Sequence, residues 1–297
     1  MKEQREVKEK GGGVAAFFDL DGTLMALPSL EQRFFGGLRS RGEIPLRNYF
    51  LWLGEAVRLA PFGIGTILQT NKMYLRGVQI FEGRGRGDEA LSFRRKGGHQ
   101  ALGQASAPSR RNPRLPVPVF FDEAMERVAW HKRQGHTIVL MSGTLEPLAR
   151  EGGQALEIVL SERGIHPAVR ICATRLEEKG GRWTGKVLGE AMFGEAKERS
   201  ARRIAEELKL DLGLCYAYGD SASDRWLLGA VGRPVAVNPD EELSRLARNR
   251  NWTVLRWKKE RNEAQRHKEW RGKIRDAEVV MLRQDVLKSQ AKAGDLG

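Results

Sequence analysis

Two pairs of acidic residues follow apolar segments of this 297-residue chain. The run DLDGT (residues 19–23) comes directly after residues 14–18, and the run GDSASD (219–224) follows residues 215–218. Of the first pair, Asp19 and Asp21, one carboxylate could attack phosphorus while the other donates and accepts protons. Asp220 and Asp224 could supply a ligand and a supporting acid for magnesium, which prefers oxygen ligands. Each run alone is also an ordinary turn, because Asp and Gly are common turn residues.

A hydroxyl and a lysine between these acidic pairs are candidate phosphate contacts. Ser142 and Gly143 follow the apolar segment 137–141 and precede a predicted helix, whose first amides can cradle a phosphate. Lys197 stands near the start of another predicted helix, where its charge could stabilise a phosphoryl transition state. A serine is also a routine helix cap, and lysine is common on helix surfaces. Together, however, the motifs point to one phosphoryl-transfer site.

Apolar segments predict the strands that would carry these residues. They are residues 14–18, 137–141, 169–173, 215–218 and 234–237, with 253–257 as a candidate sixth. Helices are predicted at 120–133, 145–163 and 196–208, and the run RLEEKGGRWTGKV predicts a hairpin that turns at Gly180-Gly181. Strands that alternate with helices predict an α/β fold, a doubly wound, Rossmann-like parallel sheet. The acidic runs would then meet at the carboxyl edge of that sheet.

The interval between residues 24 and 119 breaks this alternation. Helical periodicity covers residues 30–38, 49–59 and 64–80, whereas residues 82–115 are rich in Gly, Arg, Ser and Pro and are predicted to be irregular. Asp19 and Ser142 are separated by 122 residues, but Ser142 and Lys197 by only 54, so an insertion fits only after the first motif. We therefore expect a core at 14–27 plus 119–257, a helical cap at 28–118 and a charged tail at 258–297.

The expected cap contains an unusually apolar stretch, FLWLGEAVRLAPFGIGTIL (residues 50–68). We favour packing between cap helices as its explanation. The alternative is a lid that accepts an amphiphilic substrate or makes weak contact with a membrane surface. Glu55, Arg58 and Pro61 argue against a transmembrane span.

The net charge of +13 is concentrated in a few segments. Residues 1–13, 82–115 and 258–297 together supply +10, which is more typical of solvated segments than of an organised binding face. Aromatic residues are sparse there, so no specific nucleic-acid binding is expected. The two cysteines, Cys172 and Cys215, have no metal-ligand spacing, and the charged start lacks a secretory signal. These features predict a cytoplasmic location.

Four motifs, FFDLDGT, VLMSGT, GEAK and YGDSASD, resemble those of the haloacid dehalogenase superfamily, and within it the phosphoserine phosphatase-like branch (subfamily IB). The resemblance implies Asp19 as nucleophile and Asp21 as general acid and base. It further implies a Mg²⁺ cofactor held by Asp19, the carbonyl of Asp21 and Asp220, phosphate contacts from Gly22, Ser142, Gly143 and Lys197, and support from Ser223 and Asp224 behind them.

The same resemblance bears on the substrate. Phosphoserine phosphatases carry a glutamate nine residues after the nucleophile, where this chain has Pro28, with Glu31 three residues later. Arg58 and Arg76 are available as cap arginines for substrate recognition. We predict a magnesium-dependent phosphatase that hydrolyses a small phosphorylated metabolite through an aspartyl-phosphate. The alternatives are a phosphotransferase and a non-catalytic, basic nucleic-acid-binding or scaffold protein on the same fold.

Overall fold

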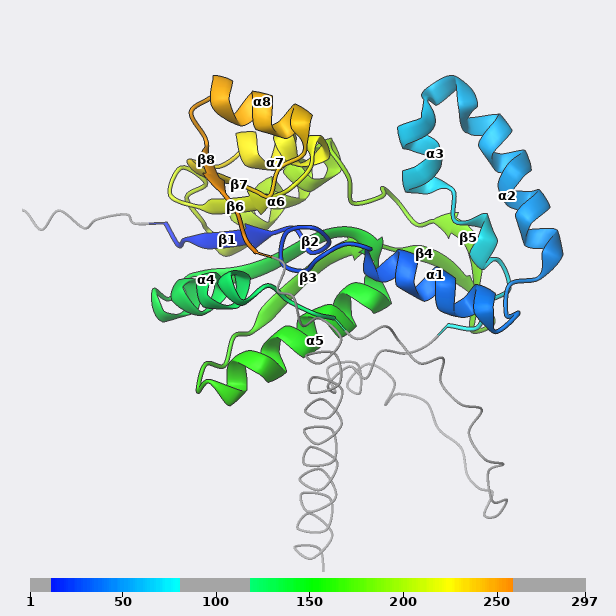
Figure 1. Ribbon diagram of the computed structural model, residues 1–297, viewed down its shortest axis with the longest axis horizontal. Coiled ribbons are helices and arrows are strands. Elements are labelled where there is room, and N and C mark those ends of the chain that lie inside the picture. Colours follow the sequence, from blue (N-terminus) through cyan, green and yellow to red (C-terminus); the bar gives the residue numbers. More distant parts are fainter. Residues whose placement is uncertain (1–11, 81–117, 259–297) are drawn as a thin grey trace, which may run out of the picture.

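The computed structural model describes residues 12–80 and 118–258. Six parallel strands form one sheet in the order β3-β2-β1-β6-β7-β8 (Figure 1). Their bounds are β1 Ala15–Phe18, β2 Thr137–Leu145, β3 Val169–Thr174, β6 Tyr216–Gly219, β7 Arg233–Val237 and β8 Thr253–Leu255. All six predicted strands are therefore confirmed, with ends that differ by a few residues.

Both faces of this sheet are covered by helices, which makes a three-layer α/β/α fold. Helices α4 (Asp122–Arg133) and α5 (Glu146–Glu162) lie on one face, and α6 (Glu195–Leu208), α7 (Arg225–Gly229) and α8 (Glu241–Asn249) on the other (Figure 1). Alternate residues of β1 enter the two cores: Ala16 and Phe18 face one, and Ala15 and Phe17 the other. This double burial explains why the strand sequences are apolar without alternation, and the doubly wound fold is confirmed.

The strand order reverses on either side of β1. Phe18 at its end pairs with Leu140 of β2 on one side and with Tyr218 of β6 on the other. Ligands of such sheets bind outside the carboxyl ends of the strands at this reversal, because the connections leave there in opposite directions. The residues that follow β1, β2 and β6 are thereby brought to one place.

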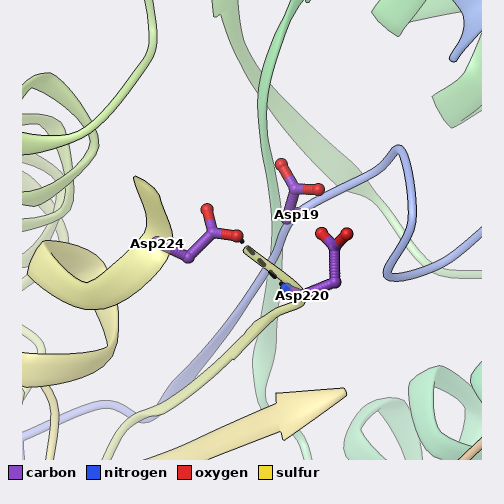
Figure 2. Close-up of side chains that lie close together, drawn as sticks. All are labelled: Asp19, Asp220 and Asp224. Atoms are coloured by element: carbon purple, nitrogen blue, oxygen red, sulfur yellow. Dashed lines mark hydrogen bonds between the residues drawn. The ribbon is translucent and has the colours of Figure 1, made fainter. Parts of the chain in front are cut away.

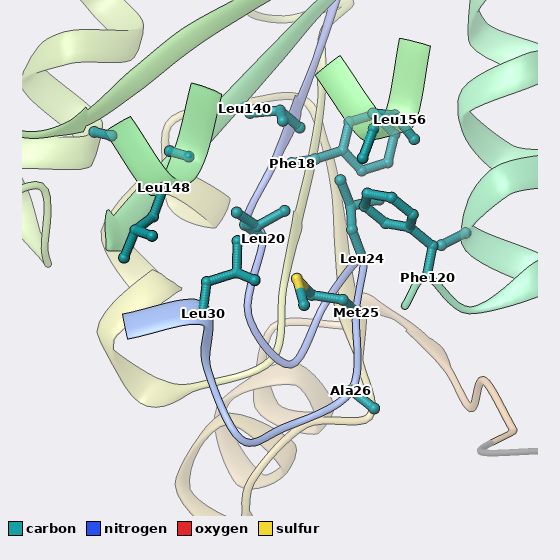
Figure 3. Close-up of a cluster of buried hydrophobic side chains, with 14 of the residues drawn as sticks. Phe18, Leu20, Leu24, Met25, Ala26, Leu30, Phe120, Leu140, Leu148 and Leu156 are labelled. Carbon is teal, nitrogen blue, oxygen red and sulfur yellow. The ribbon is translucent and has the colours of Figure 1, made fainter. Parts of the chain in front are cut away.

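The segment after β1 is held by apolar packing. Leu20, Leu24 and Met25 are fully buried and pack with residues of β2, α5 and the first turn of the next helix (Figure 3). Gly152 of α5 gives room for this contact, since a Cβ there would lie 3.2 Å from Leu20 Cδ2. Leu20 follows Asp19 and precedes Asp21, so its burial fixes the backbone of both acidic residues.

A helical cap is inserted after β1, as predicted. It contains α1 (Leu30–Ser40), α2 (Leu46–Leu59), α3 (Ile64–Thr70) and two short 3-10 turns, η1 (Ala60–Phe62) and η2 (Met73–Leu75) (Figure 1). Helix α1 begins with a capping box in which Ser29 and Gln32 satisfy each other's backbone amides. Its buried side, formed by Leu30, Phe34 and Leu38, joins the main core.

The predicted helix over residues 64–80 is wrong beyond Thr70. Asn71 takes an extended backbone with ψ of 96°. Its side-chain Nδ2 donates to the carbonyl of Trp52 at 2.8 Å, and its Oδ1 accepts from the amide of Met73. Such local side-chain bonds compete with helix continuation, which apolar periodicity does not register.

The predicted hairpin is confirmed as β4 (Leu176–Lys179) and β5 (Arg182–Val187), with Gly180 and Gly181 at positive φ in the turn. It also fastens the cap to the core, which the sequence did not indicate. The amide of Gly77 donates to the carbonyl of Trp183 at 2.8 Å, and the amide of Ile80 to Gly181 at 3.1 Å. The Trp183 side chain is buried in the main core.

The irregular segment predicted at 82–115, and the tail at 258–297 apart from Lys258, lie outside the described residues. The exact domain limits given above remain predictions. Within the described ranges, no helix is both long and apolar enough to cross a bilayer. Cys215 is buried and Cys172 half-buried, and both are free thiols.

Candidate active site

Asp19, Lys197 and Asp224 form a buried ionic group at the carboxyl edge of the sheet. Asp19 follows β1, Lys197 lies in the first turn of α6, and Asp224 follows β6. The Lys197 Nζ lies 2.5 Å from Asp19 Oδ1 and 2.6 Å from Asp224 Oδ1. The three residues are at most 6% exposed. The structure thus brings together residues that lie up to 205 positions apart in the sequence.

Asp220 completes a cluster of three carboxylates. Ligand oxygens of Asp19, Asp220 and Asp224 all lie within 4.8 Å of one another, and Figure 2 shows their side chains around one space. Thr23 Oγ1 donates to Asp220 Oδ1 at 3.1 Å. Gly22 has a φ of +91°, and a Cβ there would fall 2.1 Å from Asp220 Oδ2. A glycine is required at this position by both the backbone conformation and the close approach of Asp220.

The charges of this cluster are unbalanced, since one ammonium faces three carboxyl groups. Burial, assisted by Asp224 and Asp220, raises the pKa of Asp19 well above its usual value, although Lys197 opposes the shift. Burial and then the Asp224 charge raise the pKa of Asp220 to about 7. For Lys197, burial acts to lower the pKa, but the neighbouring Asp19 and Asp224 carboxylates outweigh it and raise the pKa. A further positive charge would therefore be stabilised here.

Asp21 is positioned by the start of the cap. Its Oδ1 accepts a hydrogen bond from the amide of Leu30, the first residue of α1, at 2.8 Å. Burial raises the pKa of Asp21 to about 6, with a smaller contribution from the Glu31 charge, while the Leu30 amide opposes the shift. A carboxyl group with a pKa near the working pH can both give and take a proton.

Ser142 and Gly143 lie near the end of β2, the strand that pairs with β1. Ser142 is buried, and its Oγ accepts from the amide of Thr144 at 3.1 Å. The carbonyl of Gly143 accepts from Thr174 Oγ1. A Cβ on Gly143 would fall 2.0 Å from the ring of Phe193, so this aromatic residue covers the turn. Thr144 Oγ1 is buried without a hydrogen-bond partner among the described residues.

Asp224 is itself fixed by the turn in which it stands. Its Oδ2 accepts from the amides of Asp220 and Ser221, each at 3.2 Å, and from Ser221 Oγ. Ser223 lies one step away, where its Oγ contacts Ser221 Oγ at 2.7 Å. Ser223 therefore supports the turn rather than touching the carboxylate cluster directly.

A family model for haloacid dehalogenase-like hydrolases matches residues 16–228, which include every residue of this site. The chain belongs to this family. The predicted assignment to the superfamily is thus confirmed, and the chain is a hydrolase of this type.

The relatives of this hydrolase include a protein named as a phosphatase. The inhibition of morphological differentiation protein of Streptomyces azureus is 35% identical over 250 residues, which cover 81% of this chain and 77% of that protein. Phosphoserine phosphatase SerB1 of Mycobacterium tuberculosis is 28% identical over 240 residues, or 81% and 70% of the two chains. A solved structure of a Bordetella pertussis protein of unknown function superposes with a TM-score of 0.54 at 25% identity, covering 82% of this hydrolase and 98% of that chain.

The donor set of the hydrolase fits a small, hard cation. It consists of carboxylate oxygens within 4.8 Å of one another, with no sulfur or imidazole in the group. Such oxygen-rich sites suit Mg²⁺. The raised pKa values of Asp19 and Asp220 point the same way, because uncompensated negative charge causes part of both shifts.

One buried ionic cluster was missed at the sequence level. Lys72 Nζ lies 2.5 Å from Glu31 Oε1, and Tyr74 Oη donates to the same oxygen at 2.5 Å. Lys72 is only 4% exposed, whereas the cap arginines considered above, Arg58 and Arg76, are exposed. A lysine inside an uncharged stretch was the available signal, but pairing across 41 positions could not be read from it.

Proposed function

We propose that this hydrolase is a magnesium-dependent phosphatase that cleaves small phosphomonoesters through an aspartyl-phosphate on Asp19. The observation that carries the proposal is the buried group at the sheet edge. In this group Lys197 contacts both Asp19 and Asp224, and Asp220 lies beside them. The lysine, together with a cation that the carboxylates would hold, can keep a phosphate dianion against the Asp19 carboxylate, which would otherwise repel it.

In the first half-reaction, a carboxylate oxygen of Asp19 attacks phosphorus and the bond from phosphorus to the leaving oxygen breaks. Asp21, in its acid form, gives its proton to that oxygen, so the alcohol leaves neutral. The pKa of Asp21, raised to about 6 chiefly by burial, keeps a fraction of the acid form available near neutrality. Lys197 stabilises the charge that builds up on the phosphoryl oxygens.

In the second half-reaction, Asp21 is a carboxylate and accepts a proton from water as the water oxygen attacks phosphorus. The bond between phosphorus and Asp19 breaks, and inorganic phosphate leaves. The amide of Leu30 holds Asp21 in one orientation through both steps. We assign Ser142, the Gly143 amide and the turn at Gly22 to phosphate binding, and Asp224 and Ser223 to holding Lys197 and its turn; the Gly22 amide itself already donates to the carbonyl of Met25 at 2.7 Å.

Asp19, the carbonyl of Asp21 and Asp220 would hold the metal. When bound, Mg²⁺ supplies electrostatic stabilisation of the transferring phosphoryl group. Thr23 would keep Asp220 oriented toward it. Gly22 allows the backbone to approach Asp220 closely enough for these oxygens to share one ion.

The buried ionic cluster of Glu31, Lys72 and Tyr74 in the cap bears on the choice of substrate. Glu31 already accepts hydrogen bonds from Lys72 and Tyr74, so its charge is compensated within the protein. A substrate ammonium group would have to displace Lys72 to reach it. This favours a small organic phosphate without an α-amino group over phosphoserine, although the relative SerB1 is named as a phosphoserine phosphatase.

We further propose that the enzyme is cytoplasmic and acts on a small molecule rather than on nucleic acid. Both cysteines are free thiols, which suits a reducing compartment. In the described core, residues 12–27 and 118–258, basic and acidic residues are equal in number, so it offers no net charge for nucleic acid.

The test is phosphate release from a panel of phosphomonoesters, with and without Mg²⁺, by the full chain and by Asp19→Asn. The panel would include phosphoserine, sugar and polyol phosphates, nucleotides and histidinol phosphate. We expect release that requires both Mg²⁺ and Asp19 and that is weakest for phosphoserine. Release of equal size from a folded Asp19→Asn variant would refute the covalent mechanism. Transfer to an added alcohol in preference to water would favour the phosphotransferase.

A further inference from the structure

The cap exposes a large apolar surface on α2, η1 and α3. Of the fifteen large hydrophobic side chains that are exposed in the described ranges, nine lie between residues 46 and 68. Seven of them are more than half exposed and are here called the cap apolar face: Leu46, Phe50, Leu53, Val57, Phe62, Ile64 and Leu68. Exposed apolar side chains are ordinary when scattered, but a concentration of this kind marks an interaction surface.

Helix α2 is apolar on two opposite sides. Leu46, Phe50, Leu53 and Val57 recur at helical spacing and are 79%, 75%, 56% and 68% exposed. The opposite side carries Ala56 and Leu59, which pack with Trp52 and with Ile67 of α3 in a small core of their own. Packing between cap helices therefore explains only one side of α2. The other side has no cover among the residues that the structure describes.

The turn between α2 and α3 is uncharged and protrudes. All six residues from 60 to 65 are exposed, and residues 59–71 contain no charged side chain. Phe62 and Ile64 are 70% and 75% exposed. Figure 1 shows α2 and α3 as a helical pair that stands away from the sheet, with this turn at its far end. A protruding apolar tip suits insertion into the planar surface of a membrane. A protein partner would instead need a matching hollow to receive the tip.

The cap also carries the net positive charge of the described residues. Residues 28–80 contain seven basic and three acidic side chains, whereas the described remainder has twenty-two of each. Arg47 and Arg58 are exposed on α2 next to the cap apolar face, and Arg58 is paired with Glu55. An excess of positive charge beside an apolar surface complements anionic lipid headgroups. A second copy of this chain would instead bring two positive caps together.

We propose that the cap apolar face docks on an anionic lipid membrane. Phe62 and Ile64 enter the boundary between headgroups and acyl chains, and the exposed α2 stripe lies along it with Arg47 at the level of the lipid phosphates. The apolar contact supplies most of the affinity, and the arginines supply the preference for anionic lipid. This inference is independent of the catalytic proposal, because none of these residues lies in the phosphoryl site.

The test is co-sedimentation of the full chain with phosphatidylcholine vesicles that contain or lack phosphatidylglycerol. The informative variant is the double substitution Phe62→Ser and Ile64→Ser, and the matched control is Leu208→Ser with Val254→Ser. Leu208 and Val254 lie on α6 and β8, outside the cap, and are 40% and 41% exposed. The control therefore removes two exposed apolar side chains from the surface of the α/β domain and leaves the cap unchanged. All four substitutions lie on the surface and should leave the circular dichroism spectrum unchanged.

Wild type and control are expected to bind anionic vesicles, and the Phe62 and Ile64 variant to bind at least about tenfold less. Binding that is equal in all three proteins and vanishes in about 0.5 M salt would overturn the proposal, because basic segments elsewhere would then suffice. Absence of binding by the wild type would also overturn it. So would a wild-type dimer in sedimentation velocity that the Phe62 and Ile64 variant loses, since the face would then be a contact between copies.

Discussion

Replacing Lys197 with methionine tests whether the buried ionic group is an electrostatic unit. The ammonium lies 2.5 and 2.6 Å from carboxylates of Asp19 and Asp224, and all three side chains are almost fully buried. Methionine keeps the length of the side chain but removes the charge. Without it, carboxylates within 4.8 Å of one another face each other directly. At an effective dielectric constant of about 20, two unit charges at that distance repel by about 3.5 kcal/mol.

Removal of one partner from a buried ion pair typically costs about 3–5 kcal/mol, which agrees with that repulsion. We therefore expect Lys197→Met to lower the free energy of unfolding by about 3–5 kcal/mol and to reduce phosphate release by at least about a hundredfold. The measurement is urea unfolding followed by tryptophan fluorescence, in buffer with a chelator so that no metal replaces the missing charge. Lys179→Met, at an exposed position of β4, is the matched control and should change stability by less than about 0.5 kcal/mol.

A second substitution separates charge repulsion from lost packing. Asparagine at position 224 keeps an oxygen for the amides of Asp220 and Ser221 but removes one negative charge. If repulsion causes the loss, Lys197→Met with Asp224→Asn will be more stable than Lys197→Met alone, by about 1.5 kcal/mol or more. A double variant less stable than the single one, or a Lys197→Met protein as stable as wild type, would refute the electrostatic argument.

Two further predictions concern a buried histidine and the glycine in the site. His131 is fully buried against Tyr218, and burial lowers its pKa to about 3, so the unfolded chain binds more protons between about pH 6.5 and 3. The stability that this group contributes is thus lost as the pH falls, by about 2 kcal/mol at pH 5. In urea unfolding, the difference in free energy of unfolding between wild type and His131→Gln should shrink by that amount. Parallel pH profiles of the two proteins would contradict this. Gly22→Ala places a Cβ against Asp220 and should abolish most phosphate release. The control Gly42→Ala, also at positive φ but in open space, should cost only about 1–2 kcal/mol of stability and leave activity intact. Equal activity losses in the two variants would show that backbone strain alone, and not the clash with Asp220, causes the loss.

The sheet and the edge that carries the candidate site could be predicted because their signals are local. Each strand is buried on both faces, so it appears as a short continuous apolar segment, and acids placed directly after such segments must reach the carboxyl edge. Asp19 and Asp220 needed only the parallel arrangement of β1 and β6 to be brought together. Lys197 is different, because its position in the first turn of α6 becomes meaningful only once Asp224 is seen to hold it.

The cap could be predicted only in outline, because its details depend on contacts between distant segments. The end of α3 is set by the Asn71 side chain, which bonds to the Trp52 carbonyl 19 positions away. The pairing of Glu31 with Lys72 joins the start of α1 to the turn after α3. Neither bond changes the apolar periodicity, so a continuous helix through residue 80 was the natural expectation and was wrong.

The exposed side of α2 illustrates a more general limit. An apolar stripe at helical spacing indicates that a helix has a face to cover, but it does not indicate what covers it. In α2, Ala56 and Leu59 satisfy that expectation against α3, and the stretch could have been explained completely by this contact. The structure separates the two sides, since Phe50 and Val57 remain 75% and 68% exposed while Ala56 between them in sequence is buried. Because Ala56 and Leu59 already make the contact with α3, the exposed stripe of α2 needs a different partner. The positive charge of the cap makes an anionic membrane surface the partner to test first.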